Sequence, residues 1–160
     1  MIATATAIWI VRSLIFLVAA VPTCLFAVRR GGSPERIVAA LICLAVIATS
    51  LVPPHTWRGV VAPLLVIDAV MLIGLVGVAL FADRFWPMYF AAVQLLTVGV
   101  HGVRAYDASV LPSVYARLAG ELAYLTLAIL AVGTWRHVKR GPETDWSWQV
   151  RDEYRATDAR

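Results

Sequence analysis

Hydrophobic residues run along this chain in long blocks that short polar links separate. The blocks cover residues 5–28, 34–52, 60–82, 86–106 and 113–135. Each is close to the ~20 residues that an α-helix needs to cross ~30 Å of hydrocarbon. The pattern therefore predicts an all-α, integral membrane helical bundle with about five transmembrane helices, in a single domain that covers residues 1–140.

The link between the first two blocks illustrates how the helices are delimited. Gly31 and Gly32 follow the first block, and Ser33-Pro34-Glu35 then supplies a helix cap, a proline at the first helical position and an acid in the first turn. A new helix is therefore expected to begin here.

The fourth block, residues 86–106, is the weakest by hydropathy. It carries three polar side chains, from Gln94, His101 and Arg104. A re-entrant segment is therefore the alternative to a full crossing at this position.

Composition supports a membrane location. Of the 160 residues, 61% are hydrophobic and 15% are charged, and the mean hydropathy is +0.78, whereas soluble domains are about 45–50% apolar and about 25% charged. The net charge is +4, but the basic residues cluster at the ends of the blocks, which argues against nucleic-acid binding. The expected partners are the lipid bilayer and either a second copy of the chain or another membrane protein.

Charge in the links predicts the orientation, because cytoplasmic loops retain Lys and Arg during insertion. With five spans, one side of the membrane receives Arg29, Arg30, Arg36, Arg84, Arg136, Lys139 and Arg140. The other side receives Arg58 and, marginally, Arg104. The N-terminus is therefore expected outside and the C-terminus inside.

The tail, residues 141–160, is polar and is expected in the cytoplasm. Trp146, Val150 and Tyr154 recur in it at four-residue spacing, which would align them on one side of a helix. An amphipathic helix on the membrane surface is the preferred interpretation. A docking segment for a partner and a frayed terminus are the alternatives.

Several ionisable residues fall inside the predicted spans, where a charged side chain is costly and usually faces the bundle interior. At 1.5 Å per residue, Asp68 and Glu121 lie about 12 Å below the outer ends of their spans, His101 roughly 8 Å and Arg117 roughly 6 Å. Arg12 is expected at a similar level. These side chains therefore share the outer half of the membrane.

The polar residues of the fourth and fifth spans follow helical spacing. The fourth span carries Gln94, Thr97, His101 and Arg104, and the fifth carries Arg117, Glu121 and Tyr124. Steps of three and four residues place each set on one face of its helix. Both faces are expected to point toward the other helices.

Three interpretations of this polar layer stay open. In the first, Arg117 pairs with Glu121 and Asp68 pairs with an arginine or with His101, and these pairs hold the helices in register.

In the second, Asp68, His101 and Glu121 form a proton or ion relay in a small oligomeric transporter or channel. In the third, Arg12, Arg104 and Arg117 bind an anionic ligand or a lipid headgroup.

Motifs for catalysis, metal binding and cofactor binding are scarce. The histidines lie on different segments, so no helix supplies a zinc-type HxxxH pair, and His101 has no evident second haem ligand. Cys24 and Cys43 each stand alone in an apolar run and are expected to be buried small hydrophobes. No catalytic residue, metal site or cofactor is therefore predicted, and an enzymatic role is disfavoured.

Residues 84–97, which read Arg-Phe-Trp-Pro-Met-Tyr-Phe-Ala-Ala-Val-Gln-Leu-Leu-Thr, together with His101, resemble a pattern in uncharacterised small polytopic inner-membrane proteins of alphaproteobacteria. The resemblance covers roughly one eighth of the chain. It implies a multi-pass protein of the bacterial inner membrane and adds Gln94 and His101 as residues of interest, without an activity. The sequence as a whole favours a non-enzymatic accessory or interaction subunit.

Overall fold

The computed structural model describes residues 2–52, 62–106, 112–141 and 144–149. Five long helices account for most of them. They are α1 (Ile2–Arg30), α2 (Ser33–Ser50), α3 (Ala62–Phe81), α4 (Trp86–Tyr106) and α5 (Pro112–Arg140). A single helical turn follows at residues 147–149. The fold is an all-α helical bundle, as the sequence predicts.

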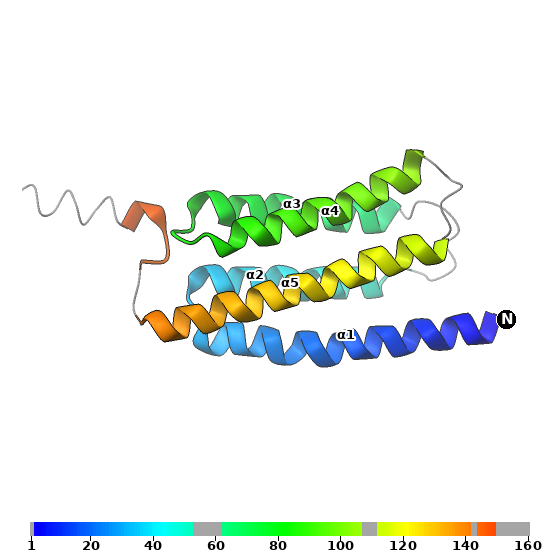
Figure 1. Ribbon diagram of the computed structural model, residues 1–160, viewed down its shortest axis with the longest axis horizontal. Helices are drawn as coiled ribbons and strands as arrows, with labels where there is room; N and C mark the ends of the chain where they lie inside the picture. The colour runs from blue at the N-terminus through cyan, green and yellow to red at the C-terminus, as the bar shows by residue number, and fades with distance from the viewer. Residues whose placement is uncertain (1, 53–61, 107–111, 142–143, 150–160) are drawn as a thin grey trace, which may run out of the picture.

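The helices form a closed ring in which each packs against the next and α5 returns to α1. Helix α2 also reaches α5 across the middle of the bundle. All five run along the long axis, with the links at alternating ends (Figure 1). We name the end that holds the α1–α2 link, the α3–α4 link and Arg140 the basic end, and the end that holds the N-terminus the far end.

Four described stretches are long and apolar enough to cross a membrane, which indicates a multi-pass membrane protein. They are Val11–Arg30, Ser33–Ser50, Ala62–Phe81 and Arg117–Arg140. Helix α4 falls short by hydropathy, although it is continuous and lies between α3 and α5. Its polar side chains lower its hydropathy but point into the bundle, and this explains the difference from the five predicted spans.

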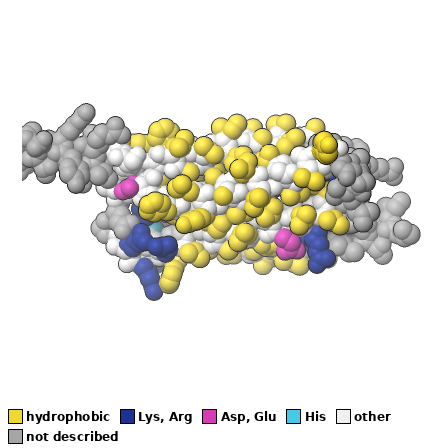
Figure 2. All heavy atoms as spheres, turned by 45° about the horizontal axis from the view of Figure 1, so that its top comes forward, with side chains coloured by type: hydrophobic (Ala, Val, Ile, Leu, Met, Phe, Trp, Pro, Cys, Tyr) yellow, Lys and Arg dark blue, Asp and Glu magenta, His cyan; other side chains and the backbone are white. Residues whose placement is uncertain are grey.

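The surface of the bundle is the reverse of that of a soluble protein. Leucine, isoleucine or valine side chains are exposed on every one of the five helices. Figure 2 shows this apolar surface along the middle of the bundle, with the charged side chains toward its two ends. A bilayer is the environment in which such a surface is stable. The core inside it includes the fully buried Val38, Leu75, Phe90 and Leu130.

Two glycines allow the tight link between α1 and α2. A Cβ atom at Gly31 would lie 2.5 Å from the carbonyl oxygen of Ala27 and from Cβ of Glu35. One at Gly32 would lie 2.4 Å from a carboxylate oxygen of Asp145. Real Cβ atoms essentially never approach so closely, so a side chain at Gly31 would displace the backbone of Ala27 or the start of α2, and one at Gly32 would displace the carboxylate of Asp145.

The two cysteines lie together, although they are far apart in the sequence. Cys24 on α1 is buried as expected, whereas Cys43 on α2 is exposed. Their thiols interact across the contact between the two helices. The expectation that both are buried is therefore wrong for Cys43, because α2 turns this side chain to the rim of its contact with α1.

Candidate functional site

A cluster of hydrogen bonds joins α3, α4 and α5 in the half of the bundle toward the far end. Its members, here named the Asp68 cluster, are Asp68, Gln94, His101 and Tyr115. Nε2 of His101 lies 2.8 Å from Oδ2 of Asp68, and the Gln94 amide donates to Oδ1 of Asp68 over 3.0 Å. The hydroxyl of Tyr115 lies 2.6 Å from Nδ1 of His101. Asp68 and His101 are thus paired, as one of the sequence interpretations predicts.

The order of donors follows from the chemistry of the groups. An ionised Asp68 only accepts hydrogen bonds, so Nε2 of His101 carries the hydrogen that faces it. In a neutral imidazole Nδ1 is then an acceptor, and the hydroxyl of Tyr115 donates to it. The chain Tyr115 to His101 to Asp68 is therefore a continuous line of hydrogen bonds across three helices.

The cluster is closed off from the surface on most sides. His101 is 2% exposed and Gln94 is 4% exposed, while the side chain of Asp68 is 24% exposed. Arg104 is buried as well and lies within electrostatic range of Tyr115. All the polar residues of the α4 face are buried, in agreement with their three-four-three spacing.

The polar face of α5 differs from its expected orientation. Arg117 is exposed, and the side chain of Glu121 is 63% exposed. Helix α5 turns Tyr115 and Leu130 into the bundle. Arg117 and Glu121 follow Tyr115 by two and six residues. At ~100° per residue, their side chains point away from the bundle interior. Glu121 is therefore not part of the Asp68 cluster. This face of α5 lies at the exposed edge of the contact with α1, where Tyr124 packs against Phe16, and not in the bundle interior.

Glu121 pairs with Arg12 of α1 instead of with Arg117. The two side chains approach to 4.0 Å, and that of Arg12 is 39% exposed. Arg12 lies over the backbone of α5, where a Cβ at Gly120 would be 2.7 Å from its guanidinium. The three arginines of the ligand interpretation thus differ in their surroundings: Arg12 is paired with Glu121, Arg104 is buried and Arg117 is exposed. This arrangement does not favour one common ligand.

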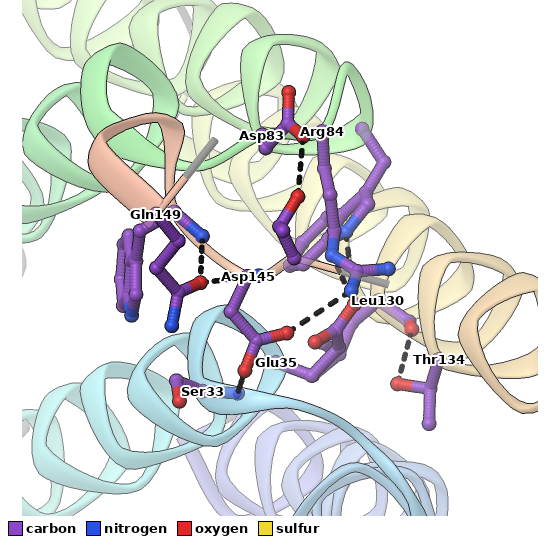
Figure 3. A network of polar contacts seen from close by, with 11 residues as sticks. Ser33, Glu35, Asp83, Arg84, Leu130, Thr134, Asp145 and Gln149 are labelled. Carbon is purple, nitrogen blue, oxygen red and sulfur yellow. Dashed lines mark hydrogen bonds and ion pairs between the residues drawn. The ribbon is translucent and has the colours of Figure 1, made fainter. Parts of the chain in front are cut away.

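A second polar group fills the basic end, where the sequence reasoning expected only charged links. Its members, here named the Glu35 network, are Glu35, Arg84, Trp86 and Asp145. Figure 3 shows Glu35, Arg84 and Asp145 together. Glu35 is fully buried and accepts a hydrogen bond of 3.1 Å from the Trp86 indole. Nε of Arg84 lies 3.9 Å from the same carboxylate, and Nη2 of Arg84 lies 3.0 Å from Asp145.

Asp145 comes from the tail and caps helix α2. The residue before this helix, Gly32, has no side chain to serve as a cap, and the N–H of Ser33 donates to Oδ2 of Asp145 over 2.9 Å. Burial acts to raise the pKa of Asp145, but the hydrogen bonds from Ser33 and the charge of Arg84 outweigh it and lower this pKa below its ordinary value.

Further hydrogen bonds fasten the tail to the α3–α4 link. The N–H of Asp83 donates to the carbonyl of Asp145, the Thr144 hydroxyl donates to Asp83, and the Ser147 hydroxyl donates to the carbonyl of Phe81. Trp146 packs against the core. The part of the tail that the structure describes therefore docks on the bundle.

The predicted amphipathic tail helix lies mostly outside the described residues. Val150 and Tyr154 lie outside the described part of the chain, so the alignment of Trp146, Val150 and Tyr154 on one side of a helix stays a prediction. Within the described part, Trp146 and Trp148 stack with their rings 5.0 Å apart. The side chain of Gln149 accepts hydrogen bonds from the N–H groups of Asp145 and Trp146, as the glutamine of a capping box does.

One signal in the sequence marks the burial of Glu35. Val38 and Ile42 follow it by three and seven residues, and all three are buried on one face of α2. Glu35 is thus in phase with an apolar stripe. No comparable signal marks Tyr115. It precedes Arg117 by two residues and Glu121 by six, so it is not on the polar face that the spacing on α5 indicates.

The described residues hold no group of three or more His, Cys, Asp or Glu side chains that would bind a metal ion. Comparisons with protein families, curated proteins and solved structures found no match to this chain. Its function is therefore inferred from the two polar groups and from the exposed pair between α1 and α5.

Proposed function

We propose that this protein is a non-enzymatic, multi-pass subunit of a bacterial inner membrane, in which the Asp68 cluster holds the helices in register. The resemblance of residues 84–97 and His101 supports the bacterial location. The concentration of Lys and Arg at the basic end supports placing that end in the cytoplasm.

The observation that carries the structural role is the completeness of the Asp68 cluster. Each oxygen of the Asp68 carboxylate accepts a donor from α4, and both nitrogens of His101 are engaged, one by α3 and one by α5. In a membrane an unsatisfied polar group is costly, so helices that carry such groups are held where their partners are. The cluster thereby fixes α4, the least apolar helix, between its neighbours.

The pair of Arg12 and Glu121 supports the interaction role. These charges are exposed beside apolar side chains, where contact with lipid is unfavourable and a polar partner lowers the cost. A patch with adjacent positive and negative groups is complementary to itself under a twofold rotation. A second copy of the chain is therefore the preferred partner for this face.

Stability of Asp68 variants tests the structural role. Asp68→Asn keeps one acceptor oxygen but turns an NH₂ group toward one of the two donors, and an unsatisfied donor costs about 1–3 kcal/mol. Thermal unfolding in detergent should therefore shift to lower temperature. Arg117→Gln is the control, because it removes an exposed charge outside the cluster and outside the Arg12–Glu121 pair, and it should leave the unfolding temperature unchanged. Equal stability of Asp68→Asn and wild type would contradict the structural role.

A proton relay is the second candidate, and the line of hydrogen bonds from Tyr115 through His101 to Asp68 favours it. Such a line lets a proton enter at one end while another leaves at the other. Proton flux into liposomes should then stop in Tyr115→Phe, which removes the hydroxyl alone. Flux that is absent in wild type, or unchanged in Tyr115→Phe, would exclude the relay and leave the structural role in place.

A further inference from the structure

A cavity of about 630 Å³ opens between α4 and α5 at the basic end. Arg136, His137 and Arg140 contribute to its wall from the last turns of α5. Figure 2 shows Lys and Arg side chains gathered at this end, with a histidine between them. The cavity lies far from the Asp68 cluster. Arg84 and Trp86 of the Glu35 network form part of its wall, but the residues that α5 contributes belong to neither polar group.

The inner wall of the cavity is apolar. Ala128, Ile129 and Val132 contribute to it from α5. Ala128 precedes Arg136 by eight residues, which is about 12 Å along a helix. A molecule that fills the cavity therefore meets cations at the end of the bundle and hydrocarbon toward its middle.

Aromatic residues of α4 complete the cavity and hold its shape. The ring of Trp86 lies against the backbone of Gly133, where a Cβ atom would be 2.8 Å from it. Its indole N–H is bonded to the buried Glu35, so the ring is fixed. Tyr89 also lines the cavity and is exposed. Aromatic side chains of this kind are enriched where headgroups meet hydrocarbon.

The charge of the cavity favours an anion. Asp83 is the one acid among the described residues that line the cavity, and Arg84 is already paired with Glu35 and Asp145, so Arg136 and Arg140 against Asp83 make the lining cationic. A phosphate oxygen near these groups would be held by charge and by hydrogen bonds.

We infer that this cavity binds an anionic phospholipid of the leaflet at the basic end. Its phosphate lies against Arg136, His137 and Arg140, and one acyl chain follows α5 past Val132 and Ala128. Basic pockets between membrane helices are suited to such headgroups. The inference requires only that the bundle spans a membrane, so it does not depend on whether the Asp68 cluster holds the helices in register or relays protons.

Spin-labelled lipids test the site in vesicles of phosphatidylcholine that contain the full chain. Wild type should associate more strongly with labelled phosphatidylglycerol than with labelled phosphatidylcholine. Each arginine near an anionic lipid contributes about fivefold, so Arg136→Gln with Arg140→Gln should reduce the preference by up to about 25-fold. Equal association of the two lipids with wild type would overturn the inference.

Arg29→Gln with Arg30→Gln is the matched control. It removes the same charge at the same end of the bundle, from two exposed residues of α1 that do not line the cavity. The preference should persist in this variant. An equal loss in both double variants would show a diffuse attraction to the membrane surface and would overturn the proposed site. Arg136→Lys with Arg140→Lys, which keeps both charges, should retain the preference, and an unfolding temperature of the glutamine variant equal to that of wild type excludes misfolding as the cause of the loss.

Two further measurements separate a lipid from a free phosphate. Inorganic phosphate added to the vesicles should leave the lipid preference intact, and full displacement of the labelled lipid would overturn the proposal in favour of a soluble ligand. Ala128→Trp should fill the apolar part of the cavity and weaken association with labelled phosphatidylglycerol. Unchanged association in this variant would overturn the placement of the acyl chain.

Discussion

Asp145 supplies from the tail the hydrogen-bond acceptor that the start of α2 lacks. The first N–H groups of a helix have no partner within the helix, and a neighbouring side chain usually satisfies one of them. Here Gly32 stands at that position, and a side chain on it would collide with Asp145. The glycine therefore both removes the local cap and makes room for the one from the tail.

Stability at low pH should depend on Asp145. Its pKa in the folded chain is lowered, so its contribution to stability is complete above the ordinary value of about 3.9 and is lost as pH falls through the folded pKa. The unfolding temperatures of wild type and Asp145→Asn should accordingly differ at neutral pH and converge on acidification. Scanning fluorimetry from pH 7 to 3 measures this difference, and one that is constant with pH would contradict the role of the carboxylate.

Single residues also show where prediction from the sequence ends. Hydropathy and spacing located the buried face of α4, because each residue there lies three or four positions from the next. The partners of Glu35 cannot be found in this way, because Arg84 and Trp86 lie in the link before α4 and at its start, and no periodicity connects them to α2. Their contacts depend on how the ends of the helices meet.

At the scale of helices, glycines mark where two elements approach most closely. Gly133 on α5 faces the fixed ring of Trp86, whereas a Cβ atom at Gly99 on α4 would meet no neighbouring atom within 4 Å. Gly133→Ala should destabilise the bundle by about 1–3 kcal/mol, because the ring cannot move without losing its bond to Glu35. Gly99→Ala, the matched control, should cost nothing. Chemical unfolding measures both, and equal stabilities would contradict the close contact of α4 and α5.

The contact between α1 and α2 can be tested with the native cysteines. Because the thiols of Cys24 and Cys43 interact, a membrane-permeant oxidant should join them within one chain. Mass spectrometry would then show the loss of two hydrogen atoms and of labelling by a maleimide. Moving the second thiol one turn along α2, in Cys43→Ala with Ile47→Cys, should slow the reaction strongly. Equal rates in the two proteins would show that α1 and α2 are not held in this register.

Hydropathy underestimates how well α4 fits a membrane, and residue spacing leaves the direction of the polar face of α5 open. Helix α4 is less apolar than a typical span, yet its polar side chains are buried and several form hydrogen bonds inside the bundle. A hydropathy scale does not count such hydrogen bonds, so it underestimates how well α4 fits a membrane. On α5, the spacing of Arg117 and Glu121 correctly places them on one face. Spacing does not indicate which neighbour that face meets, and the burial of Tyr115 turns it to the exposed edge of the contact with α1.

At the scale of the whole molecule, the positions of the start of α1 and the end of α5 bear on how many helices cross the membrane. If only the four most apolar helices crossed, the start of α1 and the end of α5 would lie on the same side. The bundle places them at opposite ends, with α4 running lengthwise between α3 and α5 (Figure 1). We therefore expect α4 to cross as a fifth span, with Arg140 in the cytoplasm and the N-terminus outside.

Reporter fusions test this topology. A reporter after Arg140 should show a cytoplasmic location, because most of the Lys and Arg among the described residues lie at the basic end. A second reporter at the N-terminus should show the outer side, and a third, inserted within residues 107–111, should show the outer side as well. If α4 did not cross, the third reporter would lie on the same side as the α3–α4 link. Both termini on one side would contradict the five-span bundle, and with it the role of the Asp68 cluster in fixing α4.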